Sequence, residues 1–496
     1  MVALAAACAG TSAAQVPVAS FKPPVSFLAP DFPGPLAVTP AGADWVGPAG
    51  GIAPDGYPEV VVAQGPDGDR FSTASTIRFY RNENDWNANP GTSLVADIFT
   101  SDLDVLADFE SRLPFVVAPL EGEIWDIELV DMNDDDAADL LVAFTYFDAF
   151  GFQRGVVAHY RADDVGTTNF GFTVQDFERF DVPVAGIAVD EFTQDGMPDV
   201  IVASGQEIDI DPTAAPLGRV FRLKNDTDGT TFGFLTREAD QVVDNTIRPT
   251  YNVVTGEFNR IRSGIGGNIR DFLTFGGNAP EQLRLGIGDG TGPFSFSMTL
   301  EDGTNCAMNN GLHIGDNSFV GTDGLSAFVV FDPFASVDQS LATAAPNELR
   351  LLHNRPRRGD FFHLCDGMNN NADFYELSCN SATSVSANGA NAFIASGNLN
   401  LDAFDDIVHI DSGSKQPTIL LGRGTPDANN RIMQFECNSF YRLPVYSPGN
   451  NGSFATTDRV LCADLNLDGR DDILIAADNT PSELVVYINR TLTSSP

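Results

Sequence analysis

The 496-residue sequence predicts an all-β fold built from repeats, and three observations support this prediction. Short runs rich in Val, Ile, Leu and Phe alternate with loops rich in Asp, Asn and Gly, and no long segment with a helical period competes with them. One phrase returns along the chain: an apolar run, an Asp/Asn-rich loop, and then Asp before a run of Val, Ile and Leu. Hydrophobic residues make up 43 % of the chain, which is ample for a large buried core.

The repeated phrase is clearest near the C-terminus, where it reads VLCADLNLDGRDDILIA from Val460. Three further copies are well formed: LVDMNDDDAADLLVA from Leu129, IAVDEFTQDGMPDVIVA from Ile187 and IASGNLNLDAFDDIVHI from Ile394. Weaker copies begin at Gly51, Gly256 and Gly315, which makes seven in all. Each copy is followed by a second alternating strand, such as STIRFYRN, GRVFRLKN or SELVVYIN, and most by a Phe-rich segment.

The spacing of the copies predicts a β-propeller. From Asp55 in the first copy to Asp468 in the last, one repeat takes about 69 residues, which suits a four-stranded blade. Seven blades account for residues 44–496, but the last copy has no room for its outer strand. The segment VSFLAPDF, Val25 to Phe32, precedes the first copy without a partner. We predict that this N-terminal strand completes the last blade and closes the ring, because an open array would expose edge strands.

These motifs carry a family resemblance. The phrase DLNLDGRDDILIA, the partner LRLGIGDGTGPFSF and the number of copies together resemble the FG-GAP or VCBS repeat family. Members of that family fold as seven-bladed β-propellers similar to the integrin α-subunit head, and the resemblance covers residues 44–496. It implies a fold more than a function, because the family includes adhesins, lectins, receptors and a few lyases.

The last loop has the ligand spacing of a calcium site. Its side chains at positions 1, 3, 5 and 9 and its backbone carbonyl at position 7 belong to Asp464, Asn466, Asp468, Asp472 and Arg470. Position 6 is Gly469, which permits a sharp turn. Hard oxygen donors in this number suit Ca²⁺ better than zinc or copper. The loop is not an EF-hand, because the Glu at position 12 is absent and strand formers flank it.

Three other loops share this spacing in part. The second carries Asp131, Asn133, Asp135 and Asp139, with Asp136 in place of the turn glycine. The sixth carries Asn398, Asn400, Asp402 and Asp406. Its two carboxylates predict weaker binding. The third keeps Asp195, Gly196 and Asp199, and either Asp190 or Glu191 takes position 1.

We therefore expect two to four structural calcium sites, each holding together a loop that like charges would otherwise push apart. The first, fourth and fifth copies have lost most ligands, as with Gly51 and Ala53 at positions 1 and 3 of the first, and are expected to be metal-free turns. The alternative for all of these loops is that they are plain hairpin turns, capped by their own Asp and Asn side chains.

The N-terminus predicts export to the extracellular space or the cell surface. Residues 1–16 are small and largely apolar and end in TSAAQ, as a secretory signal does, although no basic residue precedes Lys22. The alternative is a degenerate lipid-attachment site at Cys8. Residues 17–43 are then a linker and the closing strand. No stretch is apolar for long enough to predict a transmembrane helix.

The remaining cysteines have no CxxC spacing of the kind that zinc sites use. In an exported protein, the economical disulfides join Cys365 to Cys379 and Cys437 to Cys462, which leaves Cys306 unpaired. Buried free thiols are the alternative for either pair.

Composition and motifs reduce the number of functional classes that fit this sequence. A formal net charge of −40 argues against a nucleic-acid partner, because binding phosphates needs a basic face. The chain has no HExxH, GxSxG or P-loop, and no convergent acid/base set can be identified. The sequence thus favours an exported calcium-binding propeller that recognises a protein or glycan, or that acts as a scaffold in a surface assembly. The alternative, which the resemblance allows, is a carbohydrate-active lyase or dehydratase that uses the central pocket.

Overall fold

The computed structural model describes about half of the chain in detail, and most of the described residues lie in strands and the turns between them. The described residues are 19–31, 33–40, 43, 45, 55–65, 75–96, 102–112, 121–163, 165, 170–193, 195–204, 219–227, 235–238, 241–242, 250–256, 270–276, 282–287, 295–301, 327–331, 340–345, 348–352, 374–376, 392–401, 404–411, 416–423, 434–435, 441–443, 459–477 and 481–490.

The described residues confirm the predicted all-β class, since they form antiparallel sheets with one short helix, α1 (Val105–Arg112), and one 3₁₀ turn, η1 (Pro90–Thr92). We number the larger sheets 1 to 7 along the chain. Sheet 1 contains β2 (Pro33–Val38), β3 (Val60–Gln64), β4 (Thr76–Asn82), β5 (Leu94–Val95) and β6 (Leu103–Asp104). Sheet 2 contains β7 (Gly122–Val130), β8 (Asp139–Phe147), β9 (Gln153–Asp163) and β10 (Gly171–Phe180). Sheet 3 contains β11 (Val184–Asp190), β12 (Asp199–Ser204), β13 (Arg219–Asn225), β14 (Leu235–Arg237) and β15 (Gln241–Val242).

The second half of the chain follows the same plan. Sheet 4 contains β16 (Thr250–Gly256), β17 (Asp271–Gly276), β18 (Gln282–Ile287) and β19 (Ser295–Glu301). Sheet 5 contains β20 (Ala327–Phe331), β21 (Ser340–Ala345), β22 (Glu348–Leu352) and β23 (Phe374–Glu376). Sheet 6 contains β24 (Ala392–Gly397), β25 (Asp406–Asp411), β26 (Gln416–Leu420) and β29 (Tyr441–Arg442), beside a ribbon of β27 (Gly422–Arg423) and β28 (Gln434–Phe435). Sheet 7 contains β30 (Arg459–Ala463), β31 (Asp472–Ala477), β32 (Glu483–Tyr487) and β1 (Val25–Leu28).

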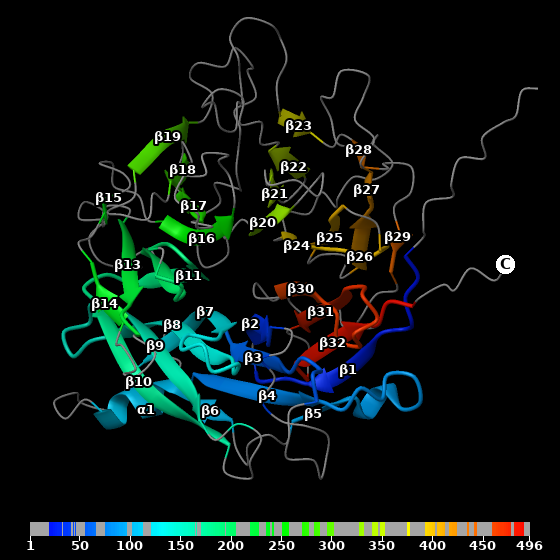
Figure 1. Cartoon of the computed structure of the whole chain (residues 1–496), viewed down its shortest axis with the longest axis horizontal. Coiled ribbons are helices and arrows are strands. Elements are labelled where there is room, and N and C mark those ends of the chain that lie inside the picture. The colour runs from blue at the N-terminus through cyan, green and yellow to red at the C-terminus, as the bar shows by residue number, and fades with distance from the viewer. Residues whose placement is uncertain are drawn as a thin grey trace, which may run out of the picture.

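The sheets lie around a common centre, with their first strands innermost (Figure 1). These first strands contact one another in chain order, from β2 through β7, β11, β16, β20 and β24 to β30, and β30 in turn contacts β2. Contacts between first strands therefore link each of these seven sheets to the sheet before it and to the sheet after it. A strand between two neighbouring sheets is buried on both sides, so its sequence is continuously apolar rather than alternating.

The two ends of the described chain meet in sheet 7. Strand β1 pairs antiparallel with β32, so that Val25 lies opposite Val486 and Leu28 lies opposite Glu483. The sequence predicts this pairing for Val25 to Phe32, but the strand ends at Leu28, two residues before Pro30, which has no N–H for a ladder bond. The pairing leaves β32 with a partner on both sides and β1 at the outer edge of the sheet.

The core lies between the sheets. In β8, Leu140, Val142 and Phe144 pack toward sheet 1, in a cluster with Val61 and Phe79. The alternate residues Leu141 and Ala143 pack toward sheet 3. Similar clusters join sheet 6 to sheet 7 and sheet 7 to sheet 1, so apolar burial links the first and last sheets as it links consecutive ones.

A recurring hydrogen bond also ties sheets together. An asparagine at the end of a third strand donates from Nδ2 to the backbone carbonyl at position 2 of the preceding sheet's first loop. The pairs are Asn82 to Leu465 O at 2.8 Å, Asn225 to Met132 O at 2.7 Å and Asn489 to Leu399 O at 2.7 Å. All three side chains are buried. The same hydrogen bond therefore joins sheet 1 to sheet 7 and joins sheets that are consecutive in the chain.

The structure corrects one disulfide prediction. Cys462 on β30 carries a free thiol, so the expected bond to Cys437 is not formed. Its side chain faces sheet 6, where a Cβ added to Gly397 would lie 2.6 Å from the Cβ of Cys462, so the thiol packs between two sheets. The other cysteines lie outside the described residues, as does the region proposed as a signal, 1–16.

No helix in the described part of the chain is long and apolar enough to cross a membrane. The longest, α1, packs Val105, Leu106 and Phe109 against sheets 1 and 2. It therefore belongs to the globular core.

The asparagine bonds predict a measurable cost of breaking the junction between sheets 1 and 7. Asn82 Nδ2 donates to the buried carbonyls of Pro58 and Leu465, so Asn82→Ala leaves both carbonyls without this donor. We expect the free energy of unfolding to fall by about 1–3 kcal/mol in urea titrations. Asn89→Ala, at an exposed residue of the segment between β4 and β5, is the control and should change it by less than about 0.5 kcal/mol. Equal effects would contradict the role of the junction.

Candidate functional site

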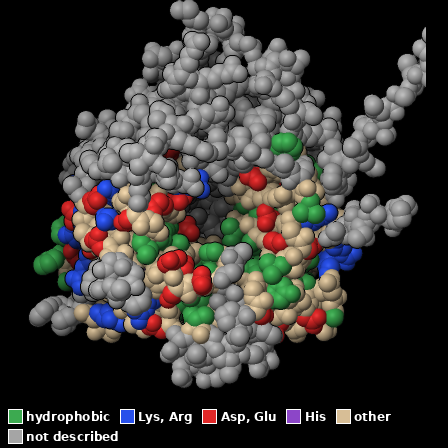
Figure 2. Space-filling view, in the orientation of Figure 1, with side chains coloured by type: hydrophobic (Ala, Val, Ile, Leu, Met, Phe, Trp, Pro, Cys, Tyr) green, Lys and Arg blue, Asp and Glu red, His purple; other side chains and the backbone are tan. Residues whose placement is uncertain are grey.

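The candidate site is the set of loops that join the first strand of a sheet to its second strand. In sheet 7 this loop connects β30 to β31, and in sheet 2 it connects β7 to β8. The described loops of this kind, in sheets 2, 3, 6 and 7, each follow one of the innermost strands (Figure 1). Figure 2 shows one face of the molecule, which is hollowed at its centre and has Asp and Glu side chains near the hollow.

The last loop is organised by its own side chains. Asp464 accepts the backbone N–H of Asp468 at 3.0 Å on Oδ1 and that of Gly469 at 2.7 Å on Oδ2. Asn466 Oδ1 accepts the N–H of Asp468 at 2.9 Å, and Asp468 Oδ1 accepts that of Arg470 at 3.0 Å. The side chains at positions 1, 3 and 5 thus turn the backbone around them, as Asx turns do.

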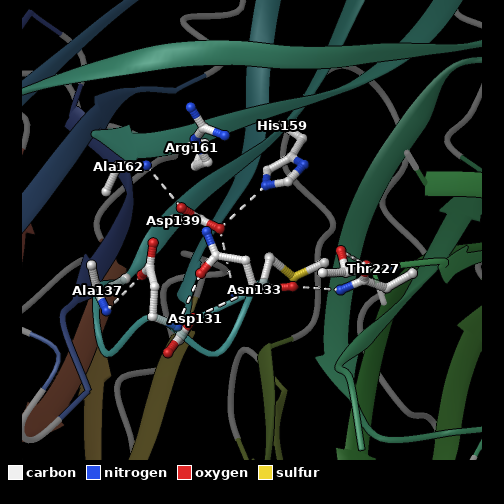
Figure 3. Close-up of polar contacts among 12 residues, drawn as sticks. Asp131, Asn133, Ala137, Asp139, His159, Arg161, Ala162 and Thr227 are labelled. Carbon is white, nitrogen blue, oxygen red and sulfur yellow. Dashed lines mark hydrogen bonds and ion pairs between the residues drawn. The ribbon is translucent and has the colours of Figure 1, made fainter. Parts of the chain in front are cut away.

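The second loop repeats these bonds (Figure 3). Asp131 accepts the N–H of Asp135 at 3.2 Å on Oδ1 and that of Asp136 at 2.8 Å on Oδ2. Asn133 Oδ1 accepts the N–H of Asp135 at 3.0 Å, and Asp135 Oδ1 accepts that of Ala137 at 3.0 Å. Two loops far apart in the sequence therefore adopt one conformation, because they share residue types at positions 1, 3 and 5.

Both loops are left-handed at positions 4 and 6. Position 4 has φ of 59° at Asp134 and 55° at Leu467, and position 6 has φ of 63° at Asp136 and 85° at Gly469. Aspartate tolerates this region better than most side chains, which explains how Asp136 replaces the turn glycine that the spacing leads one to expect.

Position 9, the fourth predicted side-chain ligand, makes hydrogen bonds that positions 1, 3 and 5 do not make. It is a fully buried aspartate in four loops, and its Oδ1 accepts a backbone N–H at the end of the sheet's third strand. The pairs are Asp139 with Ala162 (2.8 Å), Asp199 with Asn225 (2.9 Å), Asp406 with Gly422 (2.8 Å) and Asp472 with Asn489 (2.7 Å). In three of them Oδ2 accepts the N–H of position 2, from Met132 (3.3 Å), Leu399 (3.0 Å) and Leu465 (3.1 Å). This aspartate joins its loop to its sheet.

In the third loop, Glu191 rather than Asp190 takes position 1. Glu191 accepts the N–H of Thr193 at 2.9 Å and that of Gly196 at 2.6 Å, as the position-1 aspartates accept theirs. Asp195 Oδ1 accepts the N–H of Met197 at 3.1 Å, so Asp195 is position 5. Asp190 instead lies 3.5 Å from Arg270 Nε of the next sheet. With Glu191 at position 1, the third loop keeps the spacing of the second and last loops and differs from them by its longer carboxylate at position 1 and by Thr193 at position 3.

The sixth loop is described in part. Asn398 Oδ1 accepts the N–H of Leu401 at 2.8 Å, and Asn400 is fully buried. Asp402, at position 5, lies outside the described residues. In the first loop a buried Glu59 takes position 9, and its Oε2 accepts the N–H of Trp45 at 3.2 Å.

Burial and crowding raise the pKa of several loop carboxyls. Burial raises the pKa of Asp135 and of Asp464, and neighbouring carboxylates of the same loop add to the shift in each case. Burial is also the main reason that the pKa values of Asp199 and Asp471 rise to about 6. Crowded carboxylates of this kind repel one another, and a bound cation would relieve that repulsion.

Three or more His, Cys, Asp or Glu side chains gathered closely enough to hold a metal ion are not found among the described residues. In the second and last loops the side-chain oxygens face the loop's own N–H groups instead. The alternative prediction for these loops is a hairpin turn capped by its own Asp and Asn side chains. The hydrogen bonds of such a turn are present in both loops. They do not exclude a cation, since a carboxylate oxygen has two lone pairs and can accept a hydrogen bond with one of them.

The sequence does not predict the role of the junction asparagines or the environment of Glu128. The junction asparagines had a visible signal, the Asn that ends FYRN, RLKN and VYIN, but nothing in the sequence pairs it with another repeat. Glu128 lies on the innermost strand β7, half-buried between sheets 2 and 3. Burial, and then the like charge of Asp126, raise the pKa of the Glu128 carboxyl to about 8.

Comparisons with known proteins give only distant similarities. No protein-family model matches the chain, and no curated protein matches it. A soluble aldose sugar dehydrogenase from Escherichia coli matches at 12 % identity and a TM-score of 0.34, covering 95 % of this chain and 100 % of that one. A GH43_1 enzyme from Xanthomonas citri, solved with xylose, matches at 12 % and 0.27, covering 56 % of this chain and 77 % of that one. The Tc holotoxin pore of Photorhabdus luminescens matches at 12 % and 0.32, covering 87 % of this chain and 17 % of that one.

The position-9 aspartate should matter for stability whether or not metal is present. Asp139→Asn replaces one accepting oxygen by an NH₂ group, which then faces the N–H of Met132 or of Ala162. We expect a loss of about 1–3 kcal/mol in the free energy of unfolding, measured by urea titration with a chelator. Asp134→Asn, at an exposed residue of the same loop, should change it by less than about 0.5 kcal/mol. A cost that appears only when calcium is added would contradict the anchoring role.

Glu128 predicts a pH dependence of stability. Its folded pKa of about 8 lies above the ordinary value of 4.5, so the folded state holds a proton that the unfolded state releases between these values. The stability of the protein should therefore fall as pH rises through this window. Glu128→Gln removes this loss, so its advantage over the unmodified protein should grow to on the order of 1–3 kcal/mol by pH 8 in denaturant titrations. Parallel pH profiles would contradict the assignment.

Proposed function

We propose that this chain is an exported, calcium-stabilised seven-bladed β-propeller that acts as a recognition, adhesion or scaffold module for a protein or glycan partner. The observation that carries the proposal is the shared conformation of the second and last loops, which place Asp, Asn and Asp side chains at positions 1, 3 and 5 of a left-handed turn. In this proposal the seven sheets are the blades of a closed ring, as the resemblance to the FG-GAP or VCBS repeats implies.

Three properties of the loops suit a hard divalent cation. The donors are oxygens, and burial, together with the neighbouring carboxylates, raises the pKa of Asp135 and Asp464. The loop backbone is held in place by Asp139 and Asp472, so a cation would meet a turn that is already formed. When bound, calcium would supply positive charge to these loops. Positions 1, 3 and 5 would hold it through lone pairs of their side-chain oxygens that the loop's own N–H groups do not use.

The recognition role follows from rigidity and position. Loops pinned by buried aspartates to a packed ring of sheets form a preorganised surface, and ordering costs little when a partner binds. The loops also carry the sequence differences between repeats, as with Leu467 where the second loop has Asp134. Rigid scaffolds often present binding residues on loops that share one backbone conformation and differ in their exposed side chains.

The second candidate is a carbohydrate-active lyase or dehydratase that works at the centre of the ring. The specific observation in its favour is Glu128, a carboxyl that keeps its proton near neutral pH beside the innermost strands. A proton-carrying acid is one of the groups that such chemistry requires. Asp126, its charged neighbour, accepts the N–H of Ile187 at 3.1 Å and so is engaged in holding sheets 2 and 3 together. Recognition is therefore the better supported function.

Calcium titration tests the proposal. Unfolding temperature and bound calcium, by mass spectrometry, are measured for the full chain before chelation, after it, and after calcium is restored. Calcium at about one hundred times its Kd should add about 2.7 kcal/mol per site to the stability. Absence of bound calcium together with an unchanged unfolding temperature would overturn the metal assignment.

Two adjacent aspartates of the second loop provide a matched pair for this test. Asp135, at position 5, would hold calcium, whereas Asp134, at position 4, would not. Asp135→Asn should weaken one site about tenfold in calorimetric titration, because it removes one ligand charge. Asp134→Asn should leave all sites unchanged, and an equal effect of both variants would show that only overall charge matters.

A further inference from the structure

Two leucines lie at the tips of neighbouring loops. Leu401 in the sixth loop and Leu467 in the last loop both occupy position 4, with φ of 61° and 55°. Their side chains are 45 % and 47 % exposed. Within the described residues, the other non-glycine residues with positive φ are Asn84, Asp134 and Asp136, all of types that tolerate this conformation.

The local backbone conformation does not account for leucine at these positions, and packing covers only about half of each residue. A left-handed backbone disfavours a side chain such as leucine, and asparagine or glycine would fit at lower cost. An exposed leucine also gains little from burial. Strain that a sequence retains at two equivalent positions indicates a use for the side chains. An apolar side chain held out on a rigid turn is useful when a partner covers it.

The two loops lie against each other and present one surface. The N–H of Asn398 donates to Asp471 Oδ2 at 2.7 Å, and the N–H of Asp471 donates to Asn398 O at 3.0 Å. A methyl of Leu401 lies 3.4 Å from where a Cβ on Gly469 would stand, so this leucine leans over the last loop. We call the surface formed by Leu401, Leu467 and Gly469 the leucine ridge.

Acidic residues of the last loop flank Leu467 and Gly469 along the chain. Asp468 is exposed next to Leu467, and Asp464 and Asp471 lie in the same loop. The nearby cation Arg470 is buried, and its Nη1 donates to Arg490 O at 3.1 Å, so it is directed into the protein. The chain as a whole has a net charge of −40. The ridge is therefore apolar at its centre and negative at its edge.

We propose that the leucine ridge is the docking site for a partner-protein segment that combines apolar side chains with lysine or arginine. This inference rests on the proposed recognition function and names the chemistry of its partner. Positive charges would complement the acidic edge, while apolar side chains would cover the leucines. Leucine lacks the aromatic face on which sugars stack, and an anionic membrane would be repelled by the surrounding charge.

Two labelled peptides of equal length and charge test the proposal by fluorescence anisotropy, one alternating Lys with Leu and the other Lys with Ser. The full chain should bind the Lys/Leu peptide at least about tenfold more tightly. Combining Leu401→Asn with Leu467→Asn should abolish this preference and should not lower the unfolding temperature, because asparagine tolerates the left-handed turn. Leu28→Asn, at a leucine that is 62 % exposed on β1, is the control and should keep the preference.

Several outcomes would overturn the docking site: equal binding of both peptides, a preference that survives the double substitution, or tight binding to anionic phosphatidylserine vesicles instead of to the peptide. Each measurement is made with calcium and with chelator. A preference that persists while calcium fails to bind would retain the ridge and reject the metal. Calcium binding without any preference would do the reverse.

Discussion

The buried position-9 aspartate is the interaction on which the rest of the structure depends. It accepts one N–H from its own loop and one from the end of the third strand, so it fixes the loop to a sheet that is already paired. A charged group in such a place needs hydrogen bonds on both oxygens to offset its burial. The loop's position-2 carbonyl is then held where an asparagine from the next sheet can reach it, as Asn489 reaches Leu399. Local folding of one loop and packing of two sheets are thereby coupled.

This coupling explains why the loops can vary at their tips. Positions 1, 2, 3, 5 and 9 satisfy backbone groups or fill the core, and the residue at position 2 is buried in all four loops as Met132, Phe192, Leu399 and Leu465. Positions 4 and 6 point away from these bonds. At position 4, substitution changes the surface while these hydrogen bonds stay in place, so aspartate in one loop and leucine in another share one backbone conformation.

A few acidic side chains of the chain are buried where a negative charge is costly. Burial raises the pKa of Glu128 between sheets 2 and 3, and of Asp199, Asp464 and Asp471 in the loops. Each such carboxyl makes the folded state hold protons more tightly than the unfolded state does, so these groups favour folding at lower pH. A cation in the loops would act in the opposite direction at neutral pH, by stabilising the charged forms.

The sequence by itself determined the all-β class, the repeated strand pairs, the turn positions and the partner of the N-terminal strand, because these follow from local residue types and from counting strands. It also placed Asp464, Asn466, Asp468 and Asp472 in one loop, because their spacing is local. Only the tertiary structure decided that Glu191 rather than Asp190 takes position 1, that Cys462 packs as a free thiol, and that Asn82 joins the first sheet to the last. The contacts of Cys462 and Asn82 depend on which sheet lies beside which, and residues far apart in the sequence leave no local pattern to read. Glu191 takes position 1 through hydrogen bonds within its own loop, and two adjacent acidic residues in the sequence do not show which of them makes those bonds.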